Sequence, residues 1–142
     1  MSIRSWEGSI DMEAFQAFLR ALLIWLGFIQ KPDFLMRIVA DHPGREQMMA
    51  GWIYVVGGPG YQKWAYLLCP TGNGDVIQLS LQAKHRPRWR VRADFLGRPT
   101  VDPSVRQLES SYAHFWIKSG KVLWCADTGR KPDFIQPGSW QA

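Results

Sequence analysis

The sequence predicts an α+β protein in which one N-terminal amphipathic helix packs on a mostly antiparallel β-sheet or small β-sandwich. Residues 9–30 repeat apolar side chains at helical spacing with almost no breaker. From residue 51 onward, short apolar segments alternate with turns rich in glycine and proline. The length of 142 residues suits one domain with its own core. We therefore expect a single domain over 1–142, with a β-rich core over 34–126 and a loosely ordered tail over 130–142.

The predicted helix begins at Ser9, a residue type that caps helices, and acidic Asp11 and Glu13 suit its positive end. Its uninterrupted apolar run, 21–29, is well short of the roughly 20 residues that span a bilayer. We expect a core helix; a helix that docks on a partner or forms a homodimer through 9–30 is the alternative. Its apolar stripe consists of Met12, Phe15, Phe18, Leu19, Leu22, Leu23, Leu26 and Ile29.

Six or seven strands are expected after the helix, because apolar and β-branched runs recur between turn signals. The last two form a hairpin across the turn 118–121. The predicted strands are 34–39, 52–56, 62–68, 75–81, 89–93, 115–117 and 122–125.

The net charge and the small number of cysteines limit which partners and metal sites the protein can have. The chain has 17 Lys+Arg against 12 Asp+Glu, a formal charge of +5 that favours an acidic partner without indicating nucleic acid. Two cysteines cannot supply the four ligands of a structural zinc site, and sequence alone does not pair Cys69 with Cys125. No segment reads as a signal peptide, so we expect a cytoplasmic protein with reduced thiols and no membrane association.

In the segment 86–92, arginines alternate with apolar residues. In a strand, Arg88, Arg90 and Arg92 share one face and Trp89 shares the other with its apolar neighbour. Such a row can contact phosphates or an acidic protein. We expect a solvated face that suits an acidic protein partner; nucleic acid is the less favoured alternative because no other feature supports it.

One histidine stands beside several hydroxyls. His114 directly precedes the predicted strand 115–117, with Ser111 just upstream and Ser104 farther back, after a proline. A serine hydroxyl near an imidazole suits nucleophilic catalysis, and the glycine-rich turn 72–74 offers backbone N–H groups for an oxyanion. A structural turn at 102–104 and a half-buried histidine are the alternatives.

Four short motifs together resemble a bacterial domain family of unknown function. Members are encoded beside ubiquitin-like, E1-like and E2-like proteins in conjugation operons, and the resemblance covers about 40–126. The motifs are Gly51-Trp52-Ile53-Tyr54-Val55-Val56, Cys69-Pro70-Thr71-Gly72-Asn73-Gly74, Pro103-Ser104-Val105 and Ser111-Tyr112-Ala113-His114-Phe115-Trp116-Ile117.

The family pattern carries cysteines that look like zinc ligands, in Cys-Pro-Cys-Gly-Cys-Gly and Cys-x-Ser-His-aromatic-Trp-Ile. This chain keeps only Cys69; Thr71, Asn73 and Ser111 replace the other three. The resemblance therefore implies no metal and no cofactor here. Ser104 and His114 match the pattern although these cysteines are gone, which favours a role in chemistry.

The resemblance implies a peptidase that processes or deconjugates a ubiquitin-like protein, with E1-like or E2-like proteins as further partners. Ser104 is the first choice of nucleophile and Ser111 the second, with His114 as base. Three acids could orient the histidine: Asp75, Asp102 and Asp127. The alternative is a non-catalytic module, derived from a zinc-binding domain, that binds a ubiquitin-like or E2-like partner.

Overall fold

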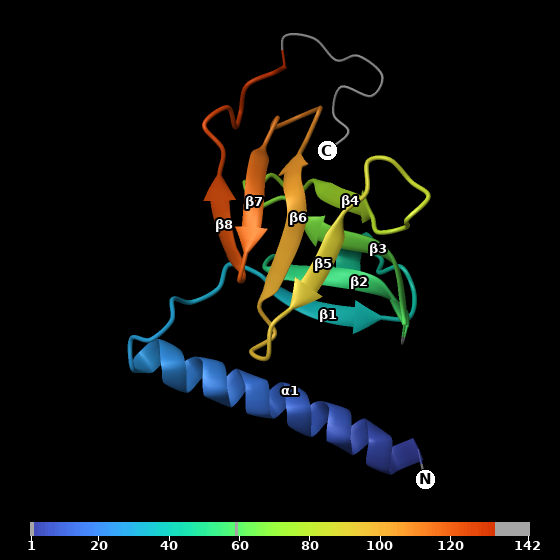
Figure 1. The fold of residues 1–142 in the computed structure, drawn as a ribbon, viewed down its shortest axis with the longest axis vertical. Helices are drawn as coiled ribbons and strands as arrows, with labels where there is room; N and C mark the ends of the chain where they lie inside the picture. Colours follow the sequence, from blue (N-terminus) through green and yellow to red (C-terminus); the bar gives the residue numbers. More distant parts are fainter. Residues whose placement is uncertain (1, 59, 133–142) are drawn as a thin grey trace.

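The computed structural model describes residues 2–58 and 60–132, which form one helix, a short 3₁₀ turn (η1) and eight strands (Figure 1). The elements are α1 (Ser2–Trp25), β1 (Leu35–Val39), η1 (Arg45–Gln47), β2 (Trp52–Gly58), β3 (Tyr61–Leu68), β4 (Val76–Ser80), β5 (Arg90–Ala93), β6 (Pro99–Arg106), β7 (His114–Lys118) and β8 (Lys121–Trp124).

The strands form two four-stranded sheets. The first has the order β1-β2-β3-β4 and the second the order β5-β6-β7-β8. All pairs are antiparallel except β1 with β2, which run parallel. In Figure 1 the strands of the second sheet cross over those of the first. The prediction of an α+β chain with mostly antiparallel strands is thus confirmed.

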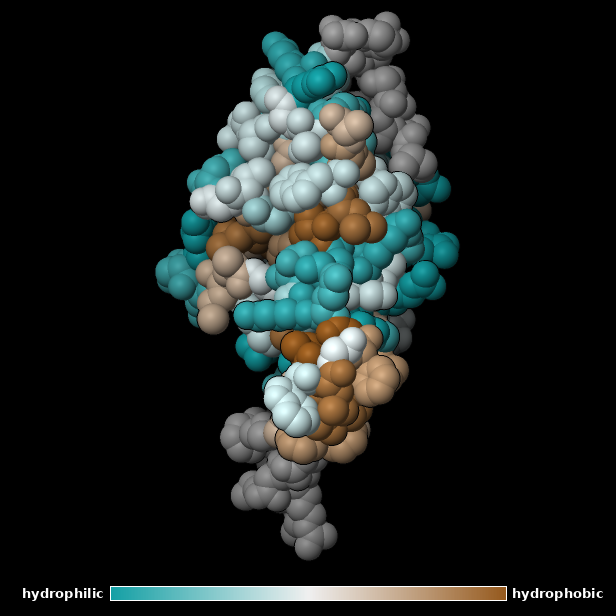
Figure 2. All heavy atoms as spheres, turned by 90° about the vertical axis from the view of Figure 1, so that its left-hand side faces the viewer, coloured by the Kyte–Doolittle hydropathy of each residue, from teal (hydrophilic) through white to brown (hydrophobic). Residues whose placement is uncertain are grey.

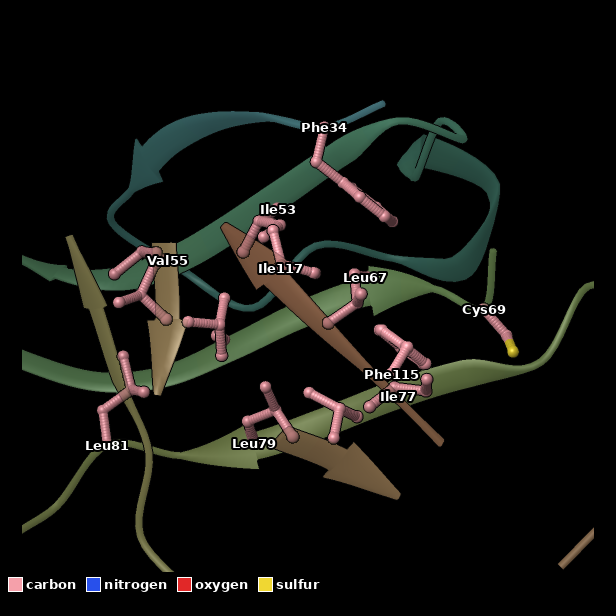
Figure 3. Packing of buried hydrophobic residues seen from close by; sticks show 14 of the residues in the cluster. Phe34, Ile53, Val55, Leu67, Cys69, Ile77, Leu79, Leu81, Phe115 and Ile117 are labelled. Carbon is pink, nitrogen blue, oxygen red and sulfur yellow. The ribbon is translucent and has the colours of Figure 1, made fainter. Parts of the chain in front are cut away.

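The core lies between the two sheets. Alternate residues of each strand point inward, as the period of two requires. Ile53 and Leu67 from the first sheet and Phe115 and Ile117 from the second are fully buried and belong to one cluster (Figure 3). This packing fixes the inner face of β6 and β7 and leaves their outer face free for polar chemistry.

Replacing Phe115 by alanine should lower the free energy of unfolding by about 3–5 kcal/mol, because a buried aromatic ring is lost and a cavity remains. Its ring is fully buried and packs edge-on against Trp124, with ring centroids 5.6 Å apart. Urea denaturation measures the change. Ile38→Ala is the matched control, since Ile38 is 55% exposed; similar losses in both variants would contradict the placement of the core.

The helix differs from the predicted span of 9–30. It begins at Ser2, so Ser9 lies inside it and does not cap it, and it ends at Trp25. Gly27, at φ +82°, explains the early end. The N–H of Phe28 donates to the Leu23 carbonyl at 2.9 Å, and that of Gly27 to the Ile24 carbonyl at 3.1 Å. This pair of bonds is the Schellman motif that closes a helix at a left-handed glycine.

The predicted packing of the apolar stripe into the core is not found. No described side chain of α1 is buried, and Phe15, Phe18 and Trp25 are 60%, 66% and 82% exposed. The helix contacts the turn between β5 and β6 through polar groups: Gln16 donates to the Phe95 carbonyl at 3.1 Å and Arg20 to the Leu96 carbonyl at 2.7 Å. Hydrophobic residues consequently gather at the surface around the C-terminal half of α1 (Figure 2).

The strand predictions hold to within one or two residues, with one omission. The hairpin of β7 and β8 lies across the predicted turn, whereas β6 was not expected and brings the number of strands to eight. Ser104 therefore lies within a strand and not at a strand end. Of the predicted tail 130–142, residues 133–142 lie outside the described part. No helix in the described part has the length and hydropathy needed to cross a membrane.

Candidate active site

Ser104 lies at an irregularity of β6. Val101 pairs with Ile117 and Val105 with Phe115, so residues 102–104 of β6 face a single residue of β7. Val101 and Val105 are both buried in the core. Ser104, which directly precedes Val105, is half-buried, and its hydroxyl lies on the outer face of the second sheet.

His114 begins β7 on the same outer face. Its neighbours Ala113 and Phe115 are buried, and the alternation of a strand points its ring the other way. The His114 Nε2 lies 3.0 Å from the Ser104 Oγ. Its register partner on β6 is Arg106, two residues from Ser104, so the serine and the histidine are diagonal neighbours across the two strands.

Asp127 completes a chain of hydrogen bonds from the turn after β8. The His114 Nδ1 lies 2.6 Å from the Asp127 Oδ1. A carboxylate accepts hydrogen bonds only, so Nδ1 carries the proton and Nε2 is free to accept the Ser104 hydroxyl. The carboxylate thus fixes the tautomer that a general base requires.

Backbone bonds to β7 hold this turn in place. The Cys125 N–H donates to the His114 carbonyl at 2.9 Å, and the Gly129 N–H to the Tyr112 carbonyl at 2.9 Å. The His114 N–H donates to the Thr128 Oγ1 at 3.0 Å. These contacts on either side of Asp127 keep its carboxylate next to the imidazole.

Arg106 is a fourth residue of the candidate site, and the sequence did not indicate it. Its Nη2 lies 2.5 Å from the Asp127 Oδ2, so each carboxylate oxygen has one partner. The hydrogen bond from His114, with the charges of His114 and Arg106, lowers the pKa of Asp127 below its usual value, although partial burial opposes this shift. The lowered pKa therefore favours the ionised form of the Asp127 carboxylate.

Ser111, the second choice of nucleophile, lies in a different cluster. Its hydroxyl donates to the Gln107 Oε1 at 2.5 Å and lies 3.8 Å from the Cys69 Sγ. Thr71 donates to the same sulfur at 3.2 Å, and that thiol donates to Gln107 at 3.2 Å. Because its bonds go to Gln107 and not to His114, Ser111 lacks a base.

This second cluster unites three of the four positions that were compared above with zinc-binding cysteines: 69, 71 and 111. The fourth, Asn73, turns away and bonds Asp75. Zinc in such sites is held by thiolates and imidazoles. One thiol, two hydroxyls and an amide do not fit the ion, and here they bond one another.

The turn 72–74 and the other two acids lie elsewhere. Gly74 accepts a hydrogen bond from Arg45 at 2.9 Å, and Asp75 bonds Asn73, both at the first sheet. Asp102 faces Arg92 at 3.8 Å. Among the contacts of the described residues, none joins this turn or these acids to His114. The proposed oxyanion role of 72–74 therefore finds no support.

The other two histidines lie outside this series of contacts: His42 is exposed and His85 is half-buried. His42 packs against the ring of Tyr66, with centroids 4.5 Å apart. His85 Nδ1 lies 2.5 Å from the hydroxyl of Ser80, a residue that is 8% exposed. Within the described part, no carboxylate approaches His85 within salt-bridge distance, so this second serine–histidine pair lacks the acid that Asp127 supplies to His114.

Cys125 is the other nucleophilic atom near the histidine, and both cysteines are free thiols. The Cys125 thiol, the His114 ring and the Asp127 carboxylate lie within 4.8 Å of one another. Burial and, secondarily, the charge of Asp127 raise the pKa of Cys125. The reactive thiolate is therefore disfavoured.

We accordingly expect Cys125→Ser to keep any catalytic activity of this site within about twofold, since serine is nearly isosteric with cysteine and the thiolate is disfavoured. Steady-state kinetics on one substrate, together with labelling by iodoacetamide, measures this. A loss as large as that of Ser104→Ala would contradict it.

The hydrogen bonds join a serine hydroxyl to an imidazole and that imidazole to a carboxylate. Serine hydrolases have this arrangement, and it recurs on unrelated folds. In comparisons with known proteins, the model of the family "Bacterial ubiquitination-like system serine protease (BubE)" matches residues 38–125. The match covers more than half of the chain, and the chain belongs to this family of serine proteases. No curated protein and no solved structure matches it.

Proposed function

We propose that this protein is a serine-type peptidase in which Ser104 is the nucleophile, His114 the general base and acid, and Asp127 the residue that orients His114. The observation that carries the proposal is the unbroken series of hydrogen bonds from Ser104 through His114 to Asp127, at 3.0 and 2.6 Å. The family supports the reaction class, since its members are described as serine proteases.

The proposed reaction follows from these positions. The Ser104 Oγ attacks the scissile carbonyl while the His114 Nε2 takes its proton. The imidazolium then returns the proton to the leaving group as the tetrahedral intermediate collapses to an acyl-enzyme. Water, deprotonated by the same nitrogen, releases the acid product. Asp127 and Arg106 hold the ring throughout, and the carboxylate stabilises the imidazolium.

Backbone N–H groups beside Ser104 are the candidates for the oxyanion hole. Residues 102–104 stand out of register with β7, so their main chain is not committed to the regular ladder there. Pro103 has no N–H and Asp102 pairs with Arg90 of β5, so the N–H of Ser104 is the first candidate donor. One well-placed donor contributes about 3–4 kcal/mol to transition-state stabilisation.

The substrate that we propose is a ubiquitin-like protein of a bacterial ubiquitination-like system, either a precursor with a C-terminal extension or a conjugate. The family description supports membership of such a system. E1-like or E2-like proteins of the same system are the further partners, and the cytoplasm, with its reduced thiols, is the proposed compartment.

The test is to incubate the protein with a ubiquitin-like protein of the proposed system that carries a C-terminal extension. A second reaction uses a conjugate of that ubiquitin-like protein, and mass spectrometry follows both reactions. Trimming that persists with a zinc chelator and disappears in Ser104→Ala supports the proposal. Trimming that Ser104→Ala retains would refute the assignment of the nucleophile.

A partner-binding role is the second candidate, favoured by the outward apolar face of α1. Phe15, Phe18, Leu22, Trp25 and Phe28 are 38–82% exposed. Apolar patches of this kind mark interaction sites, with aromatic residues as anchors. Stable association with a ubiquitin-like or E2-like protein, or a dimer of this chain, with no cleavage of any substrate, would favour this role.

A further inference from the structure

A basic hollow lies directly beside Ser104. It has a volume of about 470 Å³ and is lined by Arg86, Arg88, Arg90, Asp102, Pro103 and Trp116. Asp102 and Pro103 immediately precede Ser104 along β6, and Trp116 lies two residues after His114 on the same face of β7. A chain bound across Ser104 would therefore place a neighbouring side chain in this hollow.

No described residue forms an ion pair with the arginines of the hollow. Among the described residues, no carboxylate comes within 4 Å of Arg86, Arg88 or Arg90. The acid in the lining, Asp102, faces Arg92, which lies outside the lining, at 3.8 Å. Three arginines, of which Arg86 and Arg90 are exposed and Arg88 is half-buried, thus line the hollow without an ion-pair partner among the described residues.

Two of the three arginines are held in place by backbone carbonyls. Arg86 Nη1 donates to the carbonyls of Ala83 and His85 at 2.8 and 2.7 Å, and Arg88 Nε donates to that of Leu81 at 3.4 Å. Each guanidinium has further N–H groups in a planar fork that fits a carboxylate. Arg90 forms neither a side-chain hydrogen bond nor an ion pair with any described residue.

We propose that this hollow is a substrate subsite for the carboxylate of an aspartate or glutamate close to the scissile bond. The inference rests on the proposed function, since it deepens the role of the Ser104 site. The indole of Trp116 supplies an apolar wall for the methylene groups of such a side chain. The subsite would make this protease selective for acidic sequences around its cleavage point.

The test separates binding from cleavage by using Ser104→Ala protein. Fluorescence anisotropy compares a labelled short peptide containing two glutamates with its glutamine counterpart at fixed salt. We expect the glutamate peptide to bind at least about tenfold more tightly, and we expect Arg88→Gln with Arg90→Gln to remove that difference. Lys31→Gln with Lys63→Gln is the matched control, because it removes two exposed positive charges elsewhere and should leave the preference intact.

Equal affinity for the two peptides, or a preference that survives the double arginine substitution, would overturn the inference. A single-stranded oligonucleotide that binds through the same arginines more tightly than the peptide would also overturn it, in favour of a nucleic-acid ligand. Failure of the wild type to cleave any substrate would refute the proposed function and would leave this binding comparison unaffected.

Discussion

Ser104→Ala and His114→Ala should each lower kcat by about 10⁴–10⁶-fold and leave the fold intact. In the proposed reaction Ser104 supplies the attacking oxygen and His114 accepts its proton, so that either change alone disables the same step. Because the two residues act as a unit, the double variant should be about as impaired as either single variant. Active-site titration with a fluorophosphonate probe, followed by peptide mapping, measures the labelling of Ser104 directly.

Ser111→Ala is the matched control for this prediction. Ser111 is a partly buried serine that bonds Gln107 rather than the histidine. We expect its replacement to reduce activity by less than about tenfold, with Ser104 still labelled. If Ser111→Ala abolished labelling while Ser104→Ala kept it, the assignment of the nucleophile would be reversed.

Asp127→Asn should lower kcat by about 10³–10⁴-fold with little change in substrate affinity. The amide can donate to the His114 ring, which favours the tautomer whose Nε2 carries a proton and cannot accept one from serine. Arg106→Gln should have a much smaller effect, because it removes only the second partner of the carboxylate. A comparison of kcat and KM for the two variants separates these roles; equal losses in both would contradict them.

The lowered pKa of Asp127 gives this prediction a dependence on pH. A carboxylate whose pKa falls on folding stabilises the folded protein fully above its unfolded pKa, and this contribution disappears as the pH drops through the folded value. Asp127→Asn should therefore reduce stability at neutral pH and have little effect in strong acid. Thermal unfolding of both proteins across acid pH measures the difference, and a constant difference would contradict the assignment.

Much of the β-structure was predictable from alternation and turn residues, whereas β6 was not. Pro99 and Pro103 interrupt its pattern, and prolines within a run usually argue against a strand. The structure accommodates Pro103 in the stretch that stands out of register with β7. The same irregularity exposes Ser104 beside His114, so the feature that hid the strand is also the one that forms the site.

The helix shows a different limit of sequence reasoning. Periodicity shows that one side of α1 is apolar but not which side faces the domain. Here the two sheets bury each other, and polar side chains of α1 form its hydrogen bonds, those of Gln16 and Arg20 with the turn between β5 and β6. The predicted stripe exists, and it faces outward.

For the candidate site, the sequence indicated Ser104 and His114 but not how they meet. From the sequence, Asp127 was one of three acids that could orient His114. No sequence pattern reveals that the turn after β8 folds back on His114 through hydrogen bonds. Nothing in the sequence indicated that Arg106 belongs to the site, apart from its position two residues after Ser104. Knowing that β6 and β7 are paired would have placed Ser104, Arg106 and His114 together, but not Asp127.

The turn that carries Asp127 has a consequence for how the protein loses activity. The described contacts that position it are a few hydrogen bonds to Tyr112, His114 and Arg106, and no residue from 125 to 130 belongs to the buried core. Such a segment can open at a small free energy while the sandwich stays folded. Heating would then produce a folded but inactive population, with catalysis fading several degrees below the temperature at which the two sheets separate.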